Sequence, residues 1–410
     1  MVKKQTLAVV LAGGVGSRLF PLTQDRAKPA VPFGGKYRII DFTLSNCINS
    51  GIRKIIVLTQ YKSSSLIRHL RDGWTILNPE LGEYILNIPP QMRIGTDWYL
   101  GTADALYQNL YFIKTASPKY TLILSGDHVY KMDYSKVLWF HRRKGAELTI
   151  AGKIIPLKDA HHFGNIHADE SMRIVGFEEK PENPKPVPFD SGLALISMGI
   201  YVFTTDFMID VLEKDAKDPH STHDFGKDII PSLIHNHKVY VYPFGGLRKR
   251  DKLPDDTYWR DVGTLDAYWE ANMDLTSVTP RFDLYDPDWP FRTYQGQFPP
   301  AKSVYDNVAG GRVGAALDSL VCGGVVISGG RVIRSVLSPS VRIHSYAEVV
   351  ESVLFDRVDV GRRARIRKAI IDKDVKIPKG MEIGYDLTED AKRFTVTESG
   401  IVVVPRGTKL

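Results

Sequence analysis

The feature that most constrains the fold of this chain is a six-residue spacing of aliphatic side chains after about residue 301. The positions in this series, which contains occasional slips, are Val321, Ile327, Ile333, Ile343, Val349, Phe355, Val360, Ile366, Ile371, Ile377 and Ile383. This period does not fit a helix, but it is typical of a parallel β-helix, in which each short strand buries one aliphatic side chain. A β-sandwich with accidental spacing is the alternative. We therefore predict a β-helix over residues 301–410, with an apolar stripe and an end that favour self-association.

Residues 1–275 show a different pattern, in which short apolar runs alternate with longer stretches of helical spacing. The expected strands are 7–11, 54–58, 121–124 and 147–151, and the expected helices include 63–71 and 103–114. Such alternation predicts an α/β domain with a parallel sheet, helices on both faces and ligands at the carboxyl ends of the strands. Prolines cluster in residues 276–300, which we expect to form a linker running over the surface.

Composition excludes several classes of function. The net charge is +7, but the basic residues are not organised around stacking aromatics, so we expect no nucleic-acid partner. The charge instead favours anionic ligands such as nucleotides and sugar phosphates. No apolar run approaches the ~20 residues that span a membrane, so no membrane partner is expected. The only two cysteines, Cys47 and Cys322, build neither a disulfide framework nor a metal site, which fits the cytoplasm.

A glycine-rich loop follows the first expected strand directly. It lacks the Gly-Lys-[Ser/Thr] of a Walker loop, and Leu19 stands where a dinucleotide fingerprint has its third glycine. Glycines let backbone N–H groups crowd a phosphate, and Arg18 and Lys28 supply cations to the same anion. Taken alone, the loop is about as consistent with a tight strand-to-helix turn.

The continuation of this loop carries a family resemblance. Residues 13–23 (GGVGSRLFPLT) and 26–29 (RAKP) resemble the signature of the sugar-nucleotide pyrophosphorylases. The strings at 28–42, 44–47, 98–105, 197–203, 224–228 and 258–264 are similar to the bacterial ADP-glucose pyrophosphorylase subfamily, and the likeness runs from about residue 6 to residue 403. The resemblance implies a Rossmann-like nucleotidyltransferase domain, a left-handed parallel β-helix, a homotetramer, and the formation of ADP-glucose and pyrophosphate from ATP and glucose 1-phosphate for glycogen synthesis.

The implied reaction sets what the residues must do. A phosphate oxygen of glucose 1-phosphate attacks the α-phosphorus of ATP, and this phosphate is already largely ionised at pH 7 because its second pKa is about 6. Positioning, cations and Mg²⁺ should therefore carry the catalysis. By resemblance Arg18, Lys28 and Asp127 are catalytic, and Asp127 and Asp261 hold Mg²⁺, which suits carboxylate oxygens. An isolated aspartate would more often be a helix cap or turn residue.

The resemblance also implies two binding sites. The residues expected to bind the nucleotide are Leu11, Ala12, Gly13, Gly14, Gly16, Gln60, Tyr99, Gly101 and Thr102. Those expected to bind the sugar phosphate are Gly164, Glu179, Lys180 and Ser197. The amide of Gln60 can hydrogen-bond the adenine edge, and the ring of Tyr99 can stack on the base.

Several residues depart from the subfamily. Val15 replaces a usual arginine, Asp25 stands where relatives carry an activator-binding cation, and Pro32 and Leu100 replace polar or charged residues. The remaining regulatory candidates for anionic allosteric effectors are Arg26, Arg38 and Lys373. The last coils are unusually basic, with Arg357, Arg362, Arg363, Arg365, Arg367, Lys368 and Lys373. These coils are equally consistent with a solvated face. Two other functions stay open: a pyrophosphorylase that uses UTP or GTP, and a catalytically silent regulatory subunit.

Overall fold

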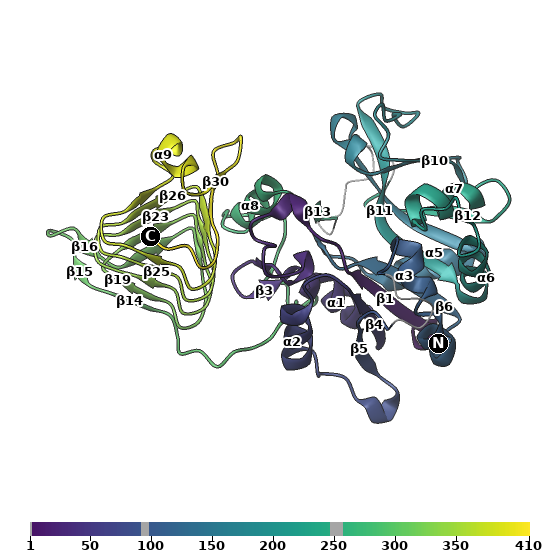
Figure 1. Ribbon diagram of the computed structural model, residues 1–410, viewed down its shortest axis with the longest axis horizontal. Helices are drawn as coiled ribbons and strands as arrows, with labels where there is room; N and C mark the ends of the chain where they lie inside the picture. Colours follow the sequence, from purple (N-terminus) through teal and green to yellow (C-terminus); the bar gives the residue numbers. More distant parts are fainter. Residues whose placement is uncertain (1, 92–97, 247–256) are drawn as a thin grey trace.

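The computed structural model of the chain describes residues 2–91, 98–246 and 257–410. Figure 1 shows a mixed α/β domain and a coil of short strands packed against its side. None of the helices in the described ranges is both long and apolar enough to cross a membrane.

The α/β domain is built on a mixed sheet that has nine strands in the described residues. Its main path runs β10 (Ile174–Glu179), β9 (Gly164–Ala168), β11 (Leu193–Thr204), β6 (Tyr120–Ser125), β1 (Thr6–Ala12), β4 (Lys54–Thr59) and β5 (Tyr84–Ile88), with β8 (Leu148–Pro156) joining β11 to β12 (Val239–Pro243). The strands β6, β1, β4 and β5 are parallel, as predicted. A purely parallel sheet is wrong, however, because β11 runs antiparallel to β6, β8 and β9. Between β8 and β11 the chain has no α-helical crossover, so strands there can pair antiparallel.

Helices cover both faces of the sheet, as the alternation predicts. Successive residues of β1 point to opposite faces: Ala8 and Val10 pack in one core cluster, and Leu7 and Val9 in the other. The helices of this domain include α1 (Ile39–Asn49), α2 (Ser64–Gly73), α3 (Thr102–Tyr107), α4 (Leu110–Ala116), α5 (Tyr134–Lys144), α6 (Thr205–Asp215) and α7 (Ile230–Leu233), with the short helices η2 (Ser17–Leu19), η3 (Lys28–Ala30), η5 (Leu157–His162) and η6 (Phe225–Ile229). Helix α8 (Leu265–Asp274) lies between this domain and the coil, and α9 (Leu387–Ala391) lies on the coil (Figure 1). The single helix expected over 103–114 is two helices, since the Asn109 side chain donates to the Ala105 carbonyl at the break.

The second body is a parallel β-helix with three sheets. The first sheet contains β14 (Lys302–Val304), β19 (Val326–Ser328), β22 (Arg342–Ile343), β25 (Asp359–Val360) and β28 (Lys376–Ile377). The second contains β17 (Ala315–Leu317), β20 (Arg331–Ile333), β23 (Glu348–Val350), β26 (Arg365–Arg367) and β29 (Glu382–Ile383). The third contains β18 (Leu320–Val321), β21 (Val336–Leu337), β24 (Val353–Leu354), β27 (Ala369–Ile371) and β31 (Val402–Val404), and β30 (Thr395–Val396) pairs antiparallel with β31. A hairpin of β15 (Asp306–Asn307) and β16 (Arg312–Val313) projects from the first coil.

The six-residue spacing identifies most interior positions of the coil, but two of them are wrong. Val332 and Leu354 point inward, not Ile333 and Phe355. The spacing slips because paired residues on successive coils are 16 apart, as in Val326 and Arg342, or 17 apart, as in Val360 and Ile377, rather than 18. Phe355 instead meets Tyr268 of the α/β domain, with ring centroids 6.4 Å apart.

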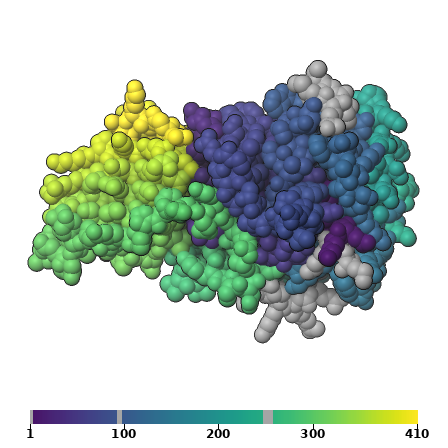
Figure 2. All heavy atoms as spheres, turned by 90° about the horizontal axis from the view of Figure 1, so that it is seen from below, coloured from purple at the N-terminus to yellow at the C-terminus, as the bar shows by residue number. Residues whose placement is uncertain are grey.

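The junction between the two bodies contains an apolar cluster, which includes part of the proline-rich segment. Phe282 and Phe291 of this segment are buried beside Phe42, and Trp289 Nε1 donates to Asn46 Oδ1 at 2.9 Å. In the space-filling view this green segment lies on the α/β domain (Figure 2). Most of this segment is exposed or half-buried, but the side chains of Phe282 and Phe291 pack in the junction.

We expect Ile366→Ala to lower the free energy of unfolding by about 3 kcal/mol, since Ile366 is fully buried inside the coil and truncation leaves a cavity. Arg365→Ala, on the exposed face of the same strand, should cost less than about 1 kcal/mol. Guanidinium unfolding of the full chain, followed by circular dichroism, measures both. Equal effects of the two variants would contradict the interior position of Ile366.

Candidate active site

The glycine loop leaves β1 at the carboxyl edge of the sheet. Gly16 has φ of +67°, and a Cβ there would lie 3.0 Å from Lys28 Cβ and 3.1 Å from Thr23 Cγ2. Thr23 Oγ1 also donates to the Gly16 carbonyl at 2.9 Å. Position 16 therefore needs glycine both for its backbone conformation and for the close approach of the segment that carries Lys28.

A cavity of about 560 Å³ opens over this loop. Its walls include all the residues expected to bind the nucleotide, namely Leu11, Ala12, Gly13, Gly14, Gly16, Gln60, Tyr99, Gly101 and Thr102. Arg18, Lys28 and Asp127 line it as well. The cavity lies at the carboxyl ends of β1, β4 and β6, which is where an open α/β sheet is expected to bind a ligand.

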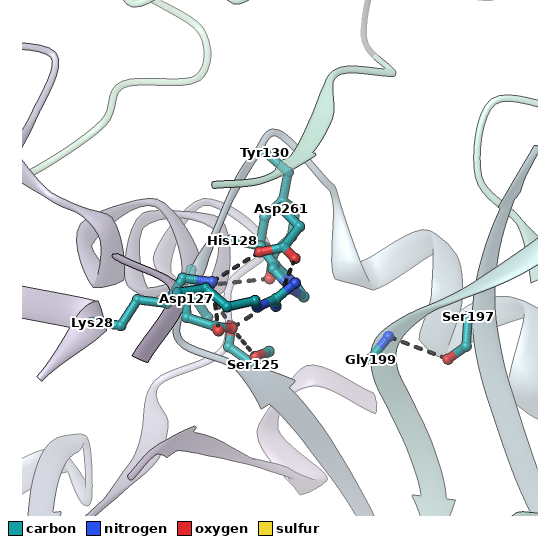
Figure 3. A network of polar contacts seen from close by, with 10 residues as sticks. Lys28, Ser125, Asp127, His128, Tyr130, Ser197, Gly199 and Asp261 are labelled. Carbon is teal, nitrogen blue, oxygen red and sulfur yellow. Dashed lines mark hydrogen bonds and ion pairs between the residues drawn. The ribbon is translucent and has the colours of Figure 1, made fainter. Parts of the chain in front are cut away.

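At the floor of this region one ammonium group joins two carboxylates (Figure 3). Lys28 Nζ lies 2.9 Å from Asp127 Oδ2 and 2.8 Å from Asp261 Oδ1. Lys28 begins η3, Asp127 follows β6, and Asp261 ends β13 (Trp259–Asp261). The pairing of β13 with β7 (His128–Tyr130) sets Asp261 opposite His128 and so brings the two aspartates together. Arg18 Nη2 lies 3.6 Å from Asp261 Oδ2.

Charge pairing sets the protonation of this group. Burial alone would lower the pKa of Lys28, but Asp127 and Asp261 outweigh it and raise that pKa. Burial would likewise raise the pKa of Asp127, yet Lys28, His128 and a hydrogen bond from Ser125 hold it well below its usual range. Lys28 is therefore charged and Asp127 ionised at neutral pH.

The same carboxylates fit a divalent cation. One ligand atom each of Asp127, His128 and Asp261 lies within 4.8 Å of the others, and the Lys28 ammonium already bridges the two aspartates as a shared cation. Two carboxylates beside the cavity of the glycine loop suit a hard ion. Sequence analysis missed His128, although it follows Asp127 directly. Its Nδ1 is buried without a hydrogen-bond partner in the part of the chain that the structure describes.

The expected sugar-phosphate residues lie beside this cavity rather than in its wall. Lys180 Nζ is 3.2 Å from Glu179 Oε1, and a Cβ at Gly164 would lie 2.9 Å from Glu179 Oε2, so these three residues are together. Ser197 Oγ accepts from Gly199 N at 3.3 Å, to one side of the lysine–aspartate group in Figure 3.

Asp224 connects the two sides, and sequence analysis assigned it no role. It lines the cavity, and its Oδ2 accepts from Thr102 Oγ1 at 3.0 Å. Its Oδ1 accepts from the backbone of Gly226, where a Cβ would lie 2.5 Å from Glu179 Oε2. The family-like string at 224–228 was the available signal.

The regulatory candidates separate into two environments. Arg38 and Lys373 line a cavity of about 650 Å³ between the two bodies, which Lys36, His69 and Arg357 also line. Burial lowers the pKa of Arg38; burial, together with Arg38, lowers that of Lys373 to about 8, although Asp356 opposes this shift. Arg26 is not in that wall, because its guanidinium is bound to Asp372. Asp25, Val15 and Leu100 are exposed, whereas Pro32 is buried.

Comparison with known proteins agrees with this architecture. Residues 7–278 match the family model described as nucleotidyl transferase, and residues 299–404 match a GlmU-like, C-terminal hexapeptide model. The chain is therefore a nucleotidyl transferase with a hexapeptide-repeat domain, which confirms the predicted fold class, including the left-handed parallel β-helix.

Curated relatives define the family more closely. Proteins named glucose-1-phosphate adenylyltransferase from Koribacter versatilis and Rhodopirellula baltica are 53% and 54% identical, over 98% of this chain and 95% and 90% of their own lengths. One from Vibrio parahaemolyticus, named glucose-1-phosphate adenylyltransferase 2, is 54% identical over 98% of both chains. The chain belongs to the glucose-1-phosphate adenylyltransferase family.

We expect Lys28→Met to lower the free energy of unfolding by about 3 kcal/mol in EDTA, because it leaves two facing carboxylates without their buried cation. Mg²⁺ should recover more stability in this variant than in the wild type, since it can replace the lost charge. Calorimetric unfolding with EDTA and with Mg²⁺ measures this. Lys185→Met, which removes an exposed lysine paired with Glu178, is the control. Unchanged stability in EDTA would show that the Lys28 bridge is not an important contact.

Proposed function

We propose that this protein transfers the adenylyl group of ATP to glucose 1-phosphate, forming ADP-glucose and pyrophosphate, the committed step of glycogen synthesis. The observation that carries the proposal is the Lys28 ammonium bound to both Asp127 and Asp261 at the floor of a cavity lined by the glycine loop. Membership of the glucose-1-phosphate adenylyltransferase family supports the choice of substrates.

On the nucleotide side, backbone N–H groups of Gly13, Gly14 and Gly16 hold phosphate oxygens. Gln60 and Tyr99 contact adenine, while Leu11, Ala12, Gly101 and Thr102 complete the wall. The ring of Tyr99 is anchored, because Asn109 Nδ2 donates to its hydroxyl at 2.9 Å. A fixed ring and a fixed loop place the α-phosphorus without further ordering.

On the reacting side, the residues supply charge rather than a general base. Asp127 and Asp261 would hold Mg²⁺, which supplies positive charge to phosphate oxygens when bound. Arg18 and Lys28 neutralise the departing pyrophosphate. Lys180 binds the phosphate of glucose 1-phosphate, and Glu179, Ser197 and Gly164 contact the sugar. The sugar phosphate then attacks in line, opposite the leaving group.

The proposal is tested by measuring pyrophosphate release from ATP, UTP, GTP and CTP with glucose 1-phosphate. We expect ATP to be preferred, and Asp127→Asn to keep the fold while lowering turnover about a thousandfold, because a metal-holding charge acts mainly in the transition state. Preference for UTP or GTP would indicate another sugar-nucleotide pyrophosphorylase. No turnover with any nucleotide would favour the regulatory subunit, and near-normal turnover of the variant would remove Asp127 from the metal site.

Lys180→Gln should raise the KM for glucose 1-phosphate and leave that for ATP nearly unchanged, since Lys180 contributes binding to one substrate only. Lys185→Gln is a matched control, because Lys185 is equally exposed and paired with a neighbouring glutamate. Steady-state kinetics with each substrate varied in turn measures both variants. Equal loss of affinity for both substrates would place Lys180 elsewhere.

We further propose a cytoplasmic homotetramer that responds to anionic effectors. The strands β14, β17 and β18 form an open end of the β-helix, each with a strand partner on one side only in the described residues, which supports self-association. In the cavity between the two bodies, Lys36, Arg38, Arg357 and Lys373 outnumber Asp356, so an anion fits there.

Activation by sugar phosphates should be weak, because Asp25 places an exposed carboxylate where the subfamily resemblance implies an activator-binding cation. We expect Asp25→Lys to restore sensitivity and Asp25→Asn, which only removes the charge, to have an intermediate effect. Turnover titrated with fructose 1,6-bisphosphate measures the response of each variant. Strong activation of the wild type at micromolar effector would refute the idea.

A further inference from the structure

An ion pair buried between the two bodies lies close to the lysine that joins the two aspartates. Arg26 Nη1 and Nη2 both donate to Asp372 Oδ1 at 3.0 Å, although the two residues are 346 apart in the chain. Arg26 is 5% exposed and Asp372 2%. Because neither side chain can turn to water, each must find its hydrogen-bond partners within the protein, and the Arg26 guanidinium finds its acceptor in Asp372.

The β-helix fixes the position of the acidic partner. Asp372 follows β27, whose Ile370 packs in the apolar junction. The backbone N–H of Asp372 donates to the Val404 carbonyl at 2.9 Å, and its Oδ1 also accepts from Lys373 N at 2.7 Å. The carboxylate is therefore part of the rigid coil.

The basic partner lies two residues before Lys28, on a segment with little freedom. Ala27 N donates to the Lys62 carbonyl at 3.2 Å, and Ala30 N donates back to the Ala27 carbonyl at 2.9 Å. On its other side the segment packs closely against Gly16, since a Cβ at that position would lie 3.0 Å from Lys28 Cβ. A displacement of Arg26 would thus move the Lys28 ammonium and press on the glycine loop.

The β-helix also holds the other partner of Lys28. Helix α8 begins four residues after Asp261 and lies between the two bodies in Figure 1. Asp266 Oδ1 accepts from Thr397 Oγ1 at 3.1 Å, and Trp269 Nε1 donates to the Glu351 carbonyl at 2.9 Å. The segment that carries Lys28 and the helix that follows Asp261 therefore both form hydrogen bonds to the β-helix.

We infer that Asp372 is a positioning residue for the active site: through Arg26 it sets the place of the Lys28 ammonium between Asp127 and Asp261. The inference rests on the proposed function for its kinetic consequence only. A misplacement of about 1 Å in a reacting group can cost on the order of a hundredfold in rate, while binding of the substrates by other groups persists.

The test is Asp372→Asn in the full chain, assayed with ATP, glucose 1-phosphate and Mg²⁺ below its unfolding temperature. We expect kcat to fall about 10- to 100-fold with both KM values within about threefold. Amide hydrogen exchange across residues 23–31 should accelerate at least about tenfold, as the anchored segment loosens. Asp359→Asn, which removes an exposed β-helix carboxylate paired with His344, should change neither readout.

A second variant separates positioning from simple attachment of the two bodies. Arg26→Met with Asp372→Leu replaces the ion pair by apolar side chains, which should keep the junction packed and restore thermal stability. We expect its kcat to stay low, because the directional hold on the segment before Lys28 is still missing. Recovery of kcat together with stability would overturn the inference, and so would normal kcat and normal exchange in Asp372→Asn. If the wild type makes no ADP-glucose, the proposed function fails, while the exchange measurement still decides the inference.

Discussion

The arrangement of this protein depends on one ammonium group shared by two carboxylates. Lys28, Asp127 and Asp261 come from three separate elements, and their contacts of 2.8 and 2.9 Å exist only because the fold joins those elements. The parallel strands β1 and β6 place the glycine loop and Asp127 at one sheet edge, and the pair β7–β13 adds Asp261. Two facing carboxylates repel each other unless a cation separates them, so the site is organised around positive charge. The same requirement makes it suited to a metal ion and a polyphosphate.

The β-helix adds rigidity at a distance from the chemistry. Its interior is aliphatic, one sheet packs its outer side against Tyr268 and other residues of the α/β domain, and another carries alternating charges outward at Arg331, Glu348, Arg365 and Glu382. The coil is therefore a rigid support, and one of its faces packs against the α/β domain. Charged groups cluster where that face meets the segment before Lys28, among them Arg26 and Asp372.

Features with a local cause could be predicted from the sequence, and features created by tertiary contact could not. The glycine loop, the alternation of strands and helices and the β-helix follow from short-range sterics and periodicity. The structure contains all three, although the β-helix repeats every 16 or 17 residues rather than every 18. Three features depend on tertiary packing partners that the local sequence does not reveal. They are the antiparallel pairing of β11, the inward position of Leu354 rather than Phe355, and the burial of Phe282. The residues expected at the nucleotide site line one cavity, but their roles stay a prediction. Residue spacing alone does not predict the ion pair between Arg26 and Asp372. It also does not predict that His128 and Asp224 lie at the candidate active site.

A crystal structure of the full chain with Mn²⁺ and a non-hydrolysable ATP analogue tests the central claim most directly. Mn²⁺ substitutes for Mg²⁺ and is located by its anomalous scattering. The account predicts an ion within about 2.2 Å of a carboxylate oxygen of both Asp127 and Asp261, with the Lys28 ammonium moved from its bridging position onto a phosphate oxygen. An ion bound by phosphate oxygens alone, with Lys28 still joining the two aspartates, would contradict it.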